Sequence, residues 1–402
     1  MDFSRCLIQA SEDTKDQSPK TKDQKPLRHE RPNTNFKMAT KTPQKRTARM
    51  TPVATGTKRR AAIEKRPRAA TLVTGGTGFL GSHLVRQLVA DGAKDIRVMA
   101  TSIPDWMVEL GVETFAGSIT NESDVKRSVE GISEVYHLAG KVSRENESAR
   151  EMYAVHVEGT RLLCEAAKAA GVKSMVLASS SGTIAVTKDG DLVPDESYPP
   201  PLEIISRWPY YASKTYQEVA ALEVFNGNGR RLVIMNPSLL LGPGDDRLSS
   251  TKVVLDFMAR KISAVPSGGL SFVDVRDAAQ AFRVAMKKGR HGERYLMGAA
   301  NWNFERFFGR LSRLTKVSAP KLALPSGLMV KGSRIVDSLF KKWDLASPVE
   351  PGAIEMAQYF WYLNCGKAAR ELGFRPRDPG ETLHETVVYL RENFLGAEAF
   401  GK

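Results

Sequence analysis

The chain of 402 residues has few cysteines, and Cys6, Cys164 and Cys365 are too scattered to form a disulfide framework. Free thiols are typical of a reducing compartment, so we expect a cytoplasmic protein. The six histidines show no paired spacing on a predicted helix. A zinc or iron site therefore has no support, and we expect no bound metal.

Long apolar runs are also missing. No stretch reaches the ~20 apolar residues that a membrane span requires, so we expect no transmembrane segment. Residues 322–340 come closest, but Lys331, Arg334 and Asp337 interrupt them and favour an amphipathic helix. Because 42% of the residues are hydrophobic, a chain of this length can still bury a sizeable core.

Acidic residues are scarce near the N-terminus, where the basic charge is concentrated. Residues 1–70 hold eighteen Lys and Arg against seven Asp and Glu, a net charge of +11, so only +3 of the total of +14 lies beyond them. Because residues 1–69 have almost no apolar periodicity, we expect a disordered basic tail. A solvated leader is the favoured interpretation. An organellar import signal within residues 38–69, a start at Met38 and a weak nucleic-acid-binding arm stay open.

The most informative stretch is residues 70–83, in which a short apolar segment leads into a glycine-rich turn and an amphipathic pattern. Residues 71–73 suit a buried parallel strand, and the apolar residues that follow the turn recur at helical spacing. No Gly-Lys-Ser/Thr closes the motif, so a Walker-type phosphate loop is excluded. The turn instead has the G-x-G-x-x-G spacing of a dinucleotide-binding site, formed by Gly75, Gly76, Gly78 and Gly81.

Strands and helices are expected to alternate after this turn. The expected strands are residues 95–100, 112–115, 134–137, 174–178 and 231–235, and the expected helices are 121–130, 150–170 and 208–225. This alternation predicts an α/β fold with a Rossmann-type doubly wound parallel sheet. Beyond residue 245 we expect a helix at 251–260, a strand at 270–273, a helix at 277–286 and then mostly helices. The prediction is a dinucleotide-binding domain at 70–245 and a smaller, mostly helical substrate lobe at 246–398, interwoven with it.

Tyr210 and Lys214 lie four residues apart at the start of a predicted helix, so both side chains project from one face. A tyrosine phenol, with a pKa of about 10 in water, is a poor acid–base catalyst at neutral pH unless a cation stabilises its phenolate. Lys214 can supply that cation. The serines at 179–181 follow a predicted strand upstream, after the nucleotide turn, in the order that a hydride-transfer enzyme requires.

Several motifs together carry a resemblance to a known family: TGGTGFLG at 74–81, VYHLAG at 135–140, VEGTRLLCEAA at 157–167, LASSSG at 177–182, YYASK at 210–214 and NPSLLLGPGD at 236–245. Over about residues 70–395 the chain resembles an extended short-chain dehydrogenase/reductase of the NAD-dependent epimerase/dehydratase type. GERYLMGAANWNF at 292–304 and CGKAARELGFRPR at 365–377 are similar to the dihydroflavonol-4-reductase-like branch. That branch includes 3β-hydroxysteroid-dehydrogenase relatives and hopanoid-associated sugar-epimerase-like proteins.

The resemblance implies a role for each matching residue. Tyr210 would exchange a proton with the substrate oxygen, and Lys214 would bind the nicotinamide ribose and lower the pKa of Tyr210. Ser180 would hydrogen-bond the substrate, with Ser181 and Thr183 as alternatives, while hydride passes between the nicotinamide and the substrate carbon. The cofactor would be bound by Tyr210 and Lys214 together with Gly75, Thr77, Gly78, Phe79, Leu80, Gly81, Thr101, Ser118, Ile119, Leu138, Ala139, Gly140, Pro237, Ser238 and Leu239.

The chain departs from the family pattern at three places. His156 stands where such enzymes often have an asparagine, and we interpret it as a helix-packing substitution. Ser118 and Ile119 replace a stretch whose aspartate often meets the adenine. Thr101 and Ser102 follow the second strand in place of an acidic residue for the ribose hydroxyls of NAD, or of an arginine. Because no acid would repel a phosphate there, NADP is favoured and NAD is the alternative.

These features predict an NAD(P)-dependent oxidoreductase that interconverts a secondary alcohol and a ketone on an apolar small molecule. A homodimer is an open expectation. The cleft of such an enzyme would exclude water with apolar side chains, for which the candidates are Trp208, Leu239, Leu240 and Phe257.

Two other interpretations stay open. A nucleotide-sugar epimerase or dehydratase would use the same three catalytic residues but would need cations for a substrate diphosphate. The candidates for that contact are Arg247, Lys252, Arg260 and Arg276. A non-catalytic nucleotide-sensing or RNA-binding protein is the third interpretation, and the intact pair of Tyr210 and Lys214 argues against it.

Overall fold

A computed structural model describes residues 70–143, 146–320, 322–323, 326–342 and 350–395. The basic tail at residues 1–69, with its expected disorder, lies outside the described residues. Within the described part, no helix is both long and apolar enough to cross a membrane. The amphipathic helix expected at residues 322–340 is present as α12 (Ser326–Lys342).

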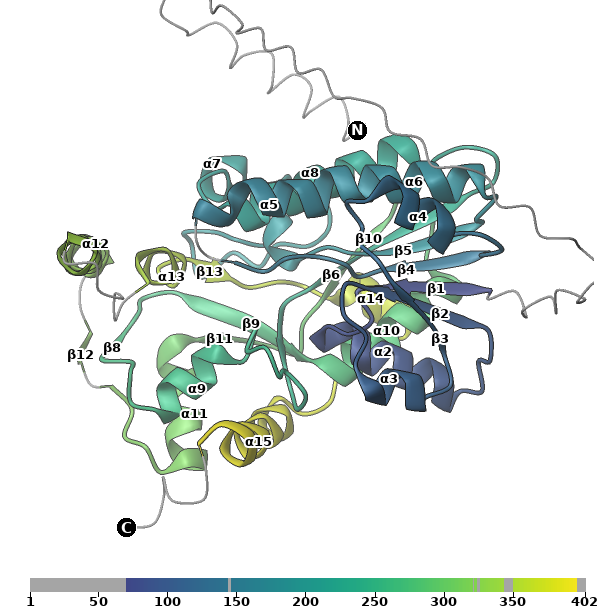
Figure 1. Cartoon of the computed structure of the whole chain (residues 1–402). Coiled ribbons are helices and arrows are strands. Elements are labelled where there is room, and N and C mark those ends of the chain that lie inside the picture. Colours follow the sequence, from purple (N-terminus) through teal and green to yellow (C-terminus); the bar gives the residue numbers. More distant parts are fainter. Residues whose placement is uncertain (1–69, 144–145, 321, 324–325, 343–349, 396–402) are drawn as a thin grey trace, which may run out of the picture. The chain divides into compact units, whose positions relative to one another are not determined.

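The described part is built around a parallel sheet of seven strands (Figure 1). Its spatial order is β10 (Arg294–Met297), β6 (Arg231–Pro237), β5 (Ser174–Ala178), β4 (Glu134–His137), β1 (Thr71–Thr74), β2 (Ile96–Ala100) and β3 (Glu113–Ala116). All of its pairings are parallel. The order therefore reverses between β1 and β4, as in a doubly wound Rossmann-type fold, and the predicted fold class is confirmed.

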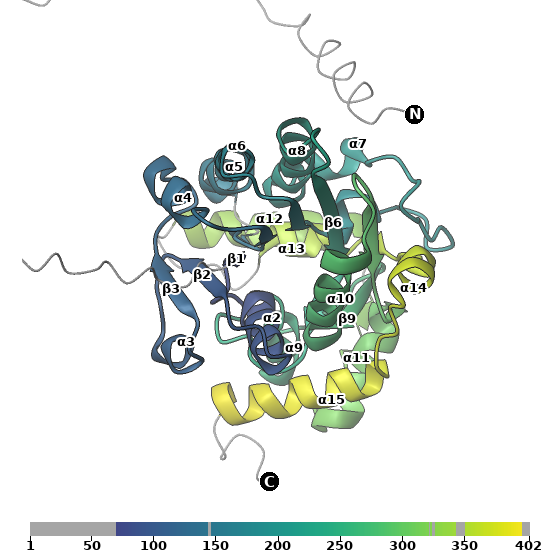
Figure 2. The same ribbon diagram turned by 90° about the vertical axis from the view of Figure 1, so that its right-hand side faces the viewer.

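The strands are apolar because helices cover both faces of the sheet, as Figure 2 shows. On one face lie α4 (Glu122–Ser128), α5 (Ala149–Tyr153), α6 (Gly159–Ala169) and α8 (Pro209–Val224), and on the other α2 (Phe79–Ala90), α3 (Asp105–Glu109), α10 (Val275–Lys288) and α14 (Gly366–Leu372). Each set packs on the sheet as a separate core: Leu84 and Phe282 are fully buried on one side, and Leu163 and Phe225 on the other. The carboxyl ends of the parallel strands meet at one edge, where ligands bind in such folds.

The single helix expected at residues 150–170 contains a change of pitch. After the short turn η1 (Asn146–Ser148), α5 and α6 are joined by η2 (Ala154–Glu158), which is one turn of π-helix. Such turns insert an extra residue, re-aim the neighbouring side chains and are frequent at functional sites. The π turn contains His156, which is fully buried.

The C-terminal lobe contains more strand than predicted. Its small sheet pairs β9 (Gly269–Asp274) with β7 (Leu239–Leu241), β11 (Ala300–Asn303) and β13 (Phe360–Trp361), and β8 (Ala264–Val265) pairs with β12 (Leu322–Ala323). Phe272, Phe307 and Leu383 are fully buried in the core of this lobe. The helices of the lobe are α9 (Lys252–Met258), α11 (Phe304–Thr315), α12, α13 (Pro351–Met356) and α15 (Pro379–Leu390), followed by η4 (Arg391–Leu395).

One strand ties this lobe to the main sheet. Strand β10 returns from it to become the seventh strand, beside β6. Between β5 and β6 the chain forms η3 (Ser181–Thr183) and α7 (Leu202–Ile205) before α8. Strands β6 and β10, which lie on opposite sides of the domain boundary predicted at residue 245, therefore belong to the same sheet. The boundary between the two domains stays a prediction.

Candidate active site

The turn after β1 leaves no room for side chains where it passes the neighbouring backbone. A Cβ on Gly75 would lie 2.6 Å from the amide nitrogen of Ala139, and a Cβ on Gly81 would collide with the Gly75 carbonyl oxygen. Gly75 also has a φ of +71°, which favours glycine. Helix α2 begins directly after the turn, at Phe79, with Gly78 as its N-cap. The first N–H groups of this helix, together with its dipole, fit the pyrophosphate of a dinucleotide.

A cavity of about 2510 Å³ lies at the carboxyl edge of the sheet. All residues predicted to bind the cofactor line it, and so do Ser180, Tyr210 and Lys214. Two other residues named from the sequence are buried elsewhere. Thr183 is fully buried, and Phe257 stacks on Phe308 in the C-terminal core with ring centroids 5.5 Å apart.

Tyr210 and Lys214 lie one turn apart at the start of α8. The Lys214 ammonium is buried and donates hydrogen bonds to the carbonyl oxygen of Ala178 and to Oε1 of Gln217, each 2.9 Å long. An ammonium group has three donors, so these two bonds fix its direction and leave one donor for a ligand in the cavity.

Burial controls the protonation of the pair. It lowers the pKa of Lys214 to about 7, against the opposing effect of the Glu218 carboxylate. Burial also raises the pKa of Tyr210; Tyr211 adds to this rise, and a hydrogen bond with Ser180 opposes it. The phenol of Tyr210 is therefore protonated at neutral pH before any ligand binds.

Glu218 is a fully buried carboxylate beneath these residues. Its Oε1 accepts hydrogen bonds from Oγ1 of Thr183 (2.9 Å), from Nδ2 of Asn236 (2.8 Å) and from the Ser179 hydroxyl. Nδ2 of Asn236 also donates to the carbonyl oxygen of Ser180 at 3.1 Å. These bonds join the end of β5 to α8 and β6. They fix the backbone that carries Ser180, and Thr183 belongs to this support rather than to the cavity wall.

His156 lies in the site beside Tyr210, a position that the sequence pattern did not indicate. Its Nε2 accepts the backbone N–H of Lys141 at 3.1 Å, so in the neutral ring Nδ1 carries the proton and donates to Oγ of Ser213 at 2.8 Å. Burial lowers the pKa of His156 well below its usual value, which keeps the ring neutral. The ring also meets Tyr210 edge-to-face, with centroids 5.8 Å apart, and lines the cavity. His156 therefore positions parts of the site as well as packing a helix.

At the other end of the cavity, small polar residues follow β2 and β3. Thr101 and Ser102 follow β2, and Ser118 and Ile119 follow β3. The backbone N–H of Ser118 donates to Oδ2 of Asp124 at 3.1 Å. The lining of this end, within residues 99–119, contains no acidic side chain. No carboxylate in this part of the lining would repel a phosphate on a bound ribose.

Aromatic side chains form a wall next to Tyr210. Trp208, Tyr211 and Trp361 line the cavity, with ring centroids 4.8 Å apart for Tyr211 and Trp361 and 5.5 Å apart for Trp208 and Trp361. The leucines at 239–240 line it too, as predicted. Sequence reasoning missed Trp361, since it reaches the site on β13, far along the chain, and no local motif marks it.

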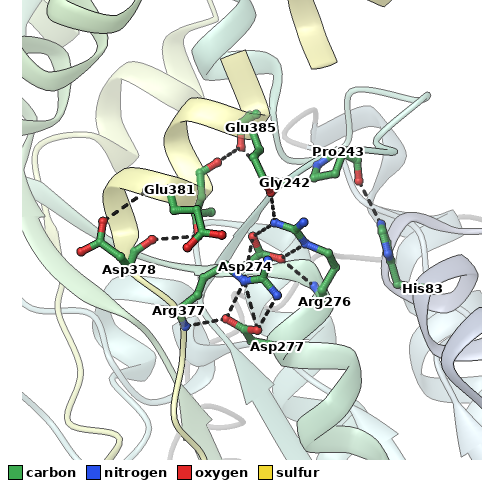
Figure 3. A network of polar contacts seen from close by, with 12 residues as sticks. His83, Gly242, Pro243, Asp274, Arg276, Asp277, Arg377, Asp378, Glu381 and Glu385 are labelled. Atoms are coloured by element: carbon green, nitrogen blue, oxygen red, sulfur yellow. Dashed lines mark hydrogen bonds and ion pairs between the residues drawn. The ribbon is translucent and has the colours of Figure 1, made fainter. Parts of the chain in front are cut away.

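Arg276, one candidate for binding a substrate diphosphate, is already bound by the protein itself (Figure 3). Its Nε and Nη2 donate to the buried carboxylate of Asp274 at 2.8 and 2.6 Å, and Nη2 also binds Glu385 of α15. Arg377 contacts the same carboxylate at 3.5 Å and pairs with Asp277 at 2.9 Å. This network joins the start of α10 to α15, and Arg276 does not line the cavity.

The other three candidate cations differ in their positions. Lys252 lines the cavity but pairs with Asp256 at 2.6 Å and Glu350 at 3.1 Å. Arg260 does not line the cavity, and Arg247 does. Within the described residues, no group of three or more His, Cys, Asp or Glu side chains could hold a metal ion.

Comparisons with known proteins agree with this geometry. A family model described as the NAD dependent epimerase/dehydratase family matches residues 71–298. A putative dihydroflavonol 4-reductase from Synechocystis is 30% identical over 328 residues, which cover 80% of this chain and 94% of the relative. Sterol demethylase protein B from Methylococcus capsulatus is 30% identical over 338 residues, which cover 80% of this chain and 98% of the relative.

Solved structures show the same fold. The structure of gox2253 matches with a TM-score of 0.69 and 26% identity, and covers 81% of this chain and 99% of its own. A nucleoside-diphosphate-sugar epimerase from Pseudomonas aeruginosa matches with a TM-score of 0.64 and 22% identity. The match covers 82% of this chain and 99% of the epimerase chain. The resemblance to extended short-chain dehydrogenase/reductases is confirmed, and the protein is an NAD(P)-dependent enzyme. The chain belongs to the NAD dependent epimerase/dehydratase family.

Proposed function

We propose that the protein is an NADP-dependent oxidoreductase, with NAD as the alternative cofactor, that interconverts a secondary alcohol and a ketone on an apolar small molecule. The observation that carries this proposal is the convergence of Ser180, Tyr210 and Lys214 on one cavity whose adjoining wall is aromatic. An apolar substrate can pack against Tyr211 and Trp361 while its oxygen reaches the hydroxyls of Ser180 and Tyr210. The names of the two curated relatives, a reductase and a sterol-modifying protein, support such a substrate.

The chain's own residues move and hold the proton. The nicotinamide, when bound, supplies the hydride. In the reducing direction, Tyr210 donates its phenolic proton to the substrate oxygen, which accepts a hydrogen bond from Ser180. Lys214 stabilises the phenolate that remains and binds the nicotinamide ribose. In the oxidising direction the same phenolate removes the alcohol proton, so one set of residues serves both directions.

A nucleotide-sugar epimerase or dehydratase with the same three residues is the alternative. The fold shared with such an enzyme favours it. However, a second diphosphate would need cations in the C-terminal lobe. Arg276 and Lys252 are paired with carboxylates, and of the other two candidates only Arg247 lines the cavity. This arrangement supports the oxidoreductase over the epimerase.

The experiment that tests the proposal compares cofactor use with sugar-nucleotide binding. Purified protein should lose its cofactor on dialysis and should oxidise NADPH in the presence of a hydrophobic ketone, or reduce NADP with the corresponding alcohol. Its Tm should not change with UDP or dTDP. Retention of NAD through dialysis, together with a Tm rise of several degrees in UDP, would overturn the oxidoreductase in favour of the epimerase.

Location, assembly and domain organisation are part of the same proposal. The thiols of Cys164 and Cys365 are unpaired, which supports a reducing, cytoplasmic environment. Residues 70–245 are assigned to the dinucleotide and residues 246–398 to the substrate. The homodimer and the nucleic-acid-binding role of the tail stay predictions.

A further inference from the structure

Arg86 is an exposed arginine on the cavity side of α2. Phe79, Ser82, His83 and Arg86 recur at intervals of three and four residues, and all of them line the cavity. The guanidinium carbon of Arg86 lies over the indole of Trp106, 4.2 Å from the ring centroid. The helix that begins at the glycine turn thus carries a cation two turns farther along its cavity face, held by an aromatic ring.

The surroundings of Arg86 provide hydroxyl groups and no competing acid. Thr101 and Ser102 follow β2 directly, and they line the same end of the cavity as Trp106. In the described part of the chain, the Arg86 guanidinium contacts the Trp106 ring rather than a carboxylate. Asp105, which precedes Trp106 on α3, is exposed and does not line the cavity. Two hydroxyls and an uncompensated guanidinium are a donor set for a dianion.

The topology shows which part of a dinucleotide would meet this donor set. Strand β2 lies beside β1, on the side away from β4. A dinucleotide in a doubly wound sheet crosses the switch point, here between β1 and β4, and the residues that follow the next strand contact the adenosine ribose. The 2′ position of that ribose would therefore lie near Thr101 and Ser102, which line the cavity together with Arg86 of α2.

We propose that Arg86, held over Trp106, forms with the hydroxyls of Thr101 and Ser102 a subsite for the 2′-phosphate of NADP, and that this subsite selects NADP over NAD. The proposal rests on the dinucleotide use in the proposed function. A guanidinium keeps its charge at all physiological pH values and binds phosphate oxygens through paired N–H donors. The indole restricts the arginine rotamers, so less side-chain entropy is lost when the phosphate binds. The helix supplies the arginine that is missing directly after β2.

Two nucleotide fragments that differ only in the 2′-phosphate provide the test: adenosine 2′,5′-bisphosphate and AMP. Isothermal titration calorimetry on the full chain should show about 10-fold or greater preference for the bisphosphate, because hydrogen bonds to charged groups contribute effects of this size. Arg86→Gln should reduce that preference about 10-fold, leave AMP binding nearly unchanged, and keep the wild-type Tm since Arg86 is exposed. Arg86→Lys should retain part of the preference, and added salt should weaken it in the wild type.

Arg127→Gln is the matched control. Arg127 also lies over an aromatic ring near this edge of the sheet, 5.2 Å from the centroid of Phe115, but it does not line the cavity. This variant should keep the full preference for the bisphosphate. Three outcomes would overturn the subsite and leave the dinucleotide assignment intact. They are equal wild-type affinities for the two nucleotides, an unchanged preference for the bisphosphate in Arg86→Gln, and a loss of that preference in Arg127→Gln as large as the loss in Arg86→Gln. A wild-type protein that binds neither fragment would contradict the proposed function itself.

Discussion

At the residue scale, the role proposed for Tyr210 requires a phenol that keeps its proton until a substrate takes it. Burial raises the pKa of Tyr210 and lowers that of Lys214 to about 7, so the unliganded site favours the neutral form of the phenol. The contacts of Lys214 with Ala178 and Gln217 hold its ammonium in place beneath the cavity. In the proposed mechanism, proton donation by Tyr210 depends on how well Lys214 stabilises the phenolate.

Replacing Tyr210 with phenylalanine removes the hydroxyl and keeps the ring. Turnover by Tyr210→Phe should fall by roughly 10² to 10⁴-fold, the contribution of positioned proton transfer, while the Kd for NADP stays nearly unchanged. Steady-state kinetics on the identified ketone, with NADP titrations, measure both. Tyr216→Phe on the same helix is the control, because Tyr216 is 47% exposed and packs on Tyr153 outside the cavity. Near-normal turnover by Tyr210→Phe would show that the proton comes from elsewhere.

Some residues of the site could be predicted from the sequence because local spacing fixes their geometry. Tyr210 and Lys214 share a helical face whatever the rest of the fold does. The position of the His156 ring beside Tyr210 depends on a π turn and on a hydrogen bond to Ser213 of another helix. The sequence pattern indicates neither of them. Helical spacing alone could have placed Arg86 on the same face of α2 as Phe79 and Ser82. The contact of Arg86 with Trp106, on which the proposed phosphate subsite depends, forms only because α3 lies beside α2 in the fold.

At the scale of elements, the alternating strands and helices could be predicted because each strand of a doubly wound sheet is a short apolar run with its own turn. Strand β10 could not be placed from the sequence, since it joins β6 after passing through another lobe. The pairing of β9 with β7, β11 and β13 is long-range for the same reason. A strand at residues 270–273, which corresponds to β9, was predicted from the local pattern, whereas its partners β7, β11 and β13 were not.

The network in Figure 3 holds α10 and α15 together, and its centre is the fully buried carboxylate of Asp274. Burial would raise the pKa of Asp274, but hydrogen bonds and charges from Arg276, with Arg377, lower it overall. Its contribution to stability is therefore present above the unfolded pKa of about 3.9 and is lost as the pH falls through the lower folded value.

Asp274→Asn should keep the cap on α10 but remove the charge that the two arginines share. We expect a loss of up to about 3 kcal/mol in the free energy of unfolding, below the full cost of breaking a buried pair, because Arg276 and Arg377 are 25% and 26% exposed. Thermal unfolding at pH 7 measures this loss, and the difference from wild type should shrink toward pH 3. Asp378→Asn, an exposed cap of α15, is the control and should leave the Tm nearly unchanged. Equal melting of Asp274→Asn and wild type would show that the network does not stabilise the lobe.

At the scale of the whole molecule, the cavity takes its two ends from segments of different character. The glycine turn and strand ends of the main sheet line one end, and α9 and α13 of the C-terminal lobe contribute to the other. The end beside the glycine turn could be predicted from its motifs. The aromatic wall next to Tyr210 could not, because it combines Trp208 and Tyr211 with Trp361, which only tertiary packing brings together.

Most of the net positive charge of the chain lies in the N-terminal tail, outside the part that contains the predicted catalytic residues. Residues 1–70 carry +11 of the net +14, and the near absence of apolar periodicity in residues 1–69 predicts that they form no packed core. A chain lacking residues 1–66 should therefore keep the Tm and the NADP affinity of the full protein, measured by thermal unfolding and calorimetry. Any nucleic-acid binding by the full chain should be absent from the truncated one, and should weaken steeply with salt, because it would rest on phosphate contacts of the basic tail. A truncated protein that fails to fold, or that loses its cofactor affinity, would show that the tail belongs to the catalytic unit.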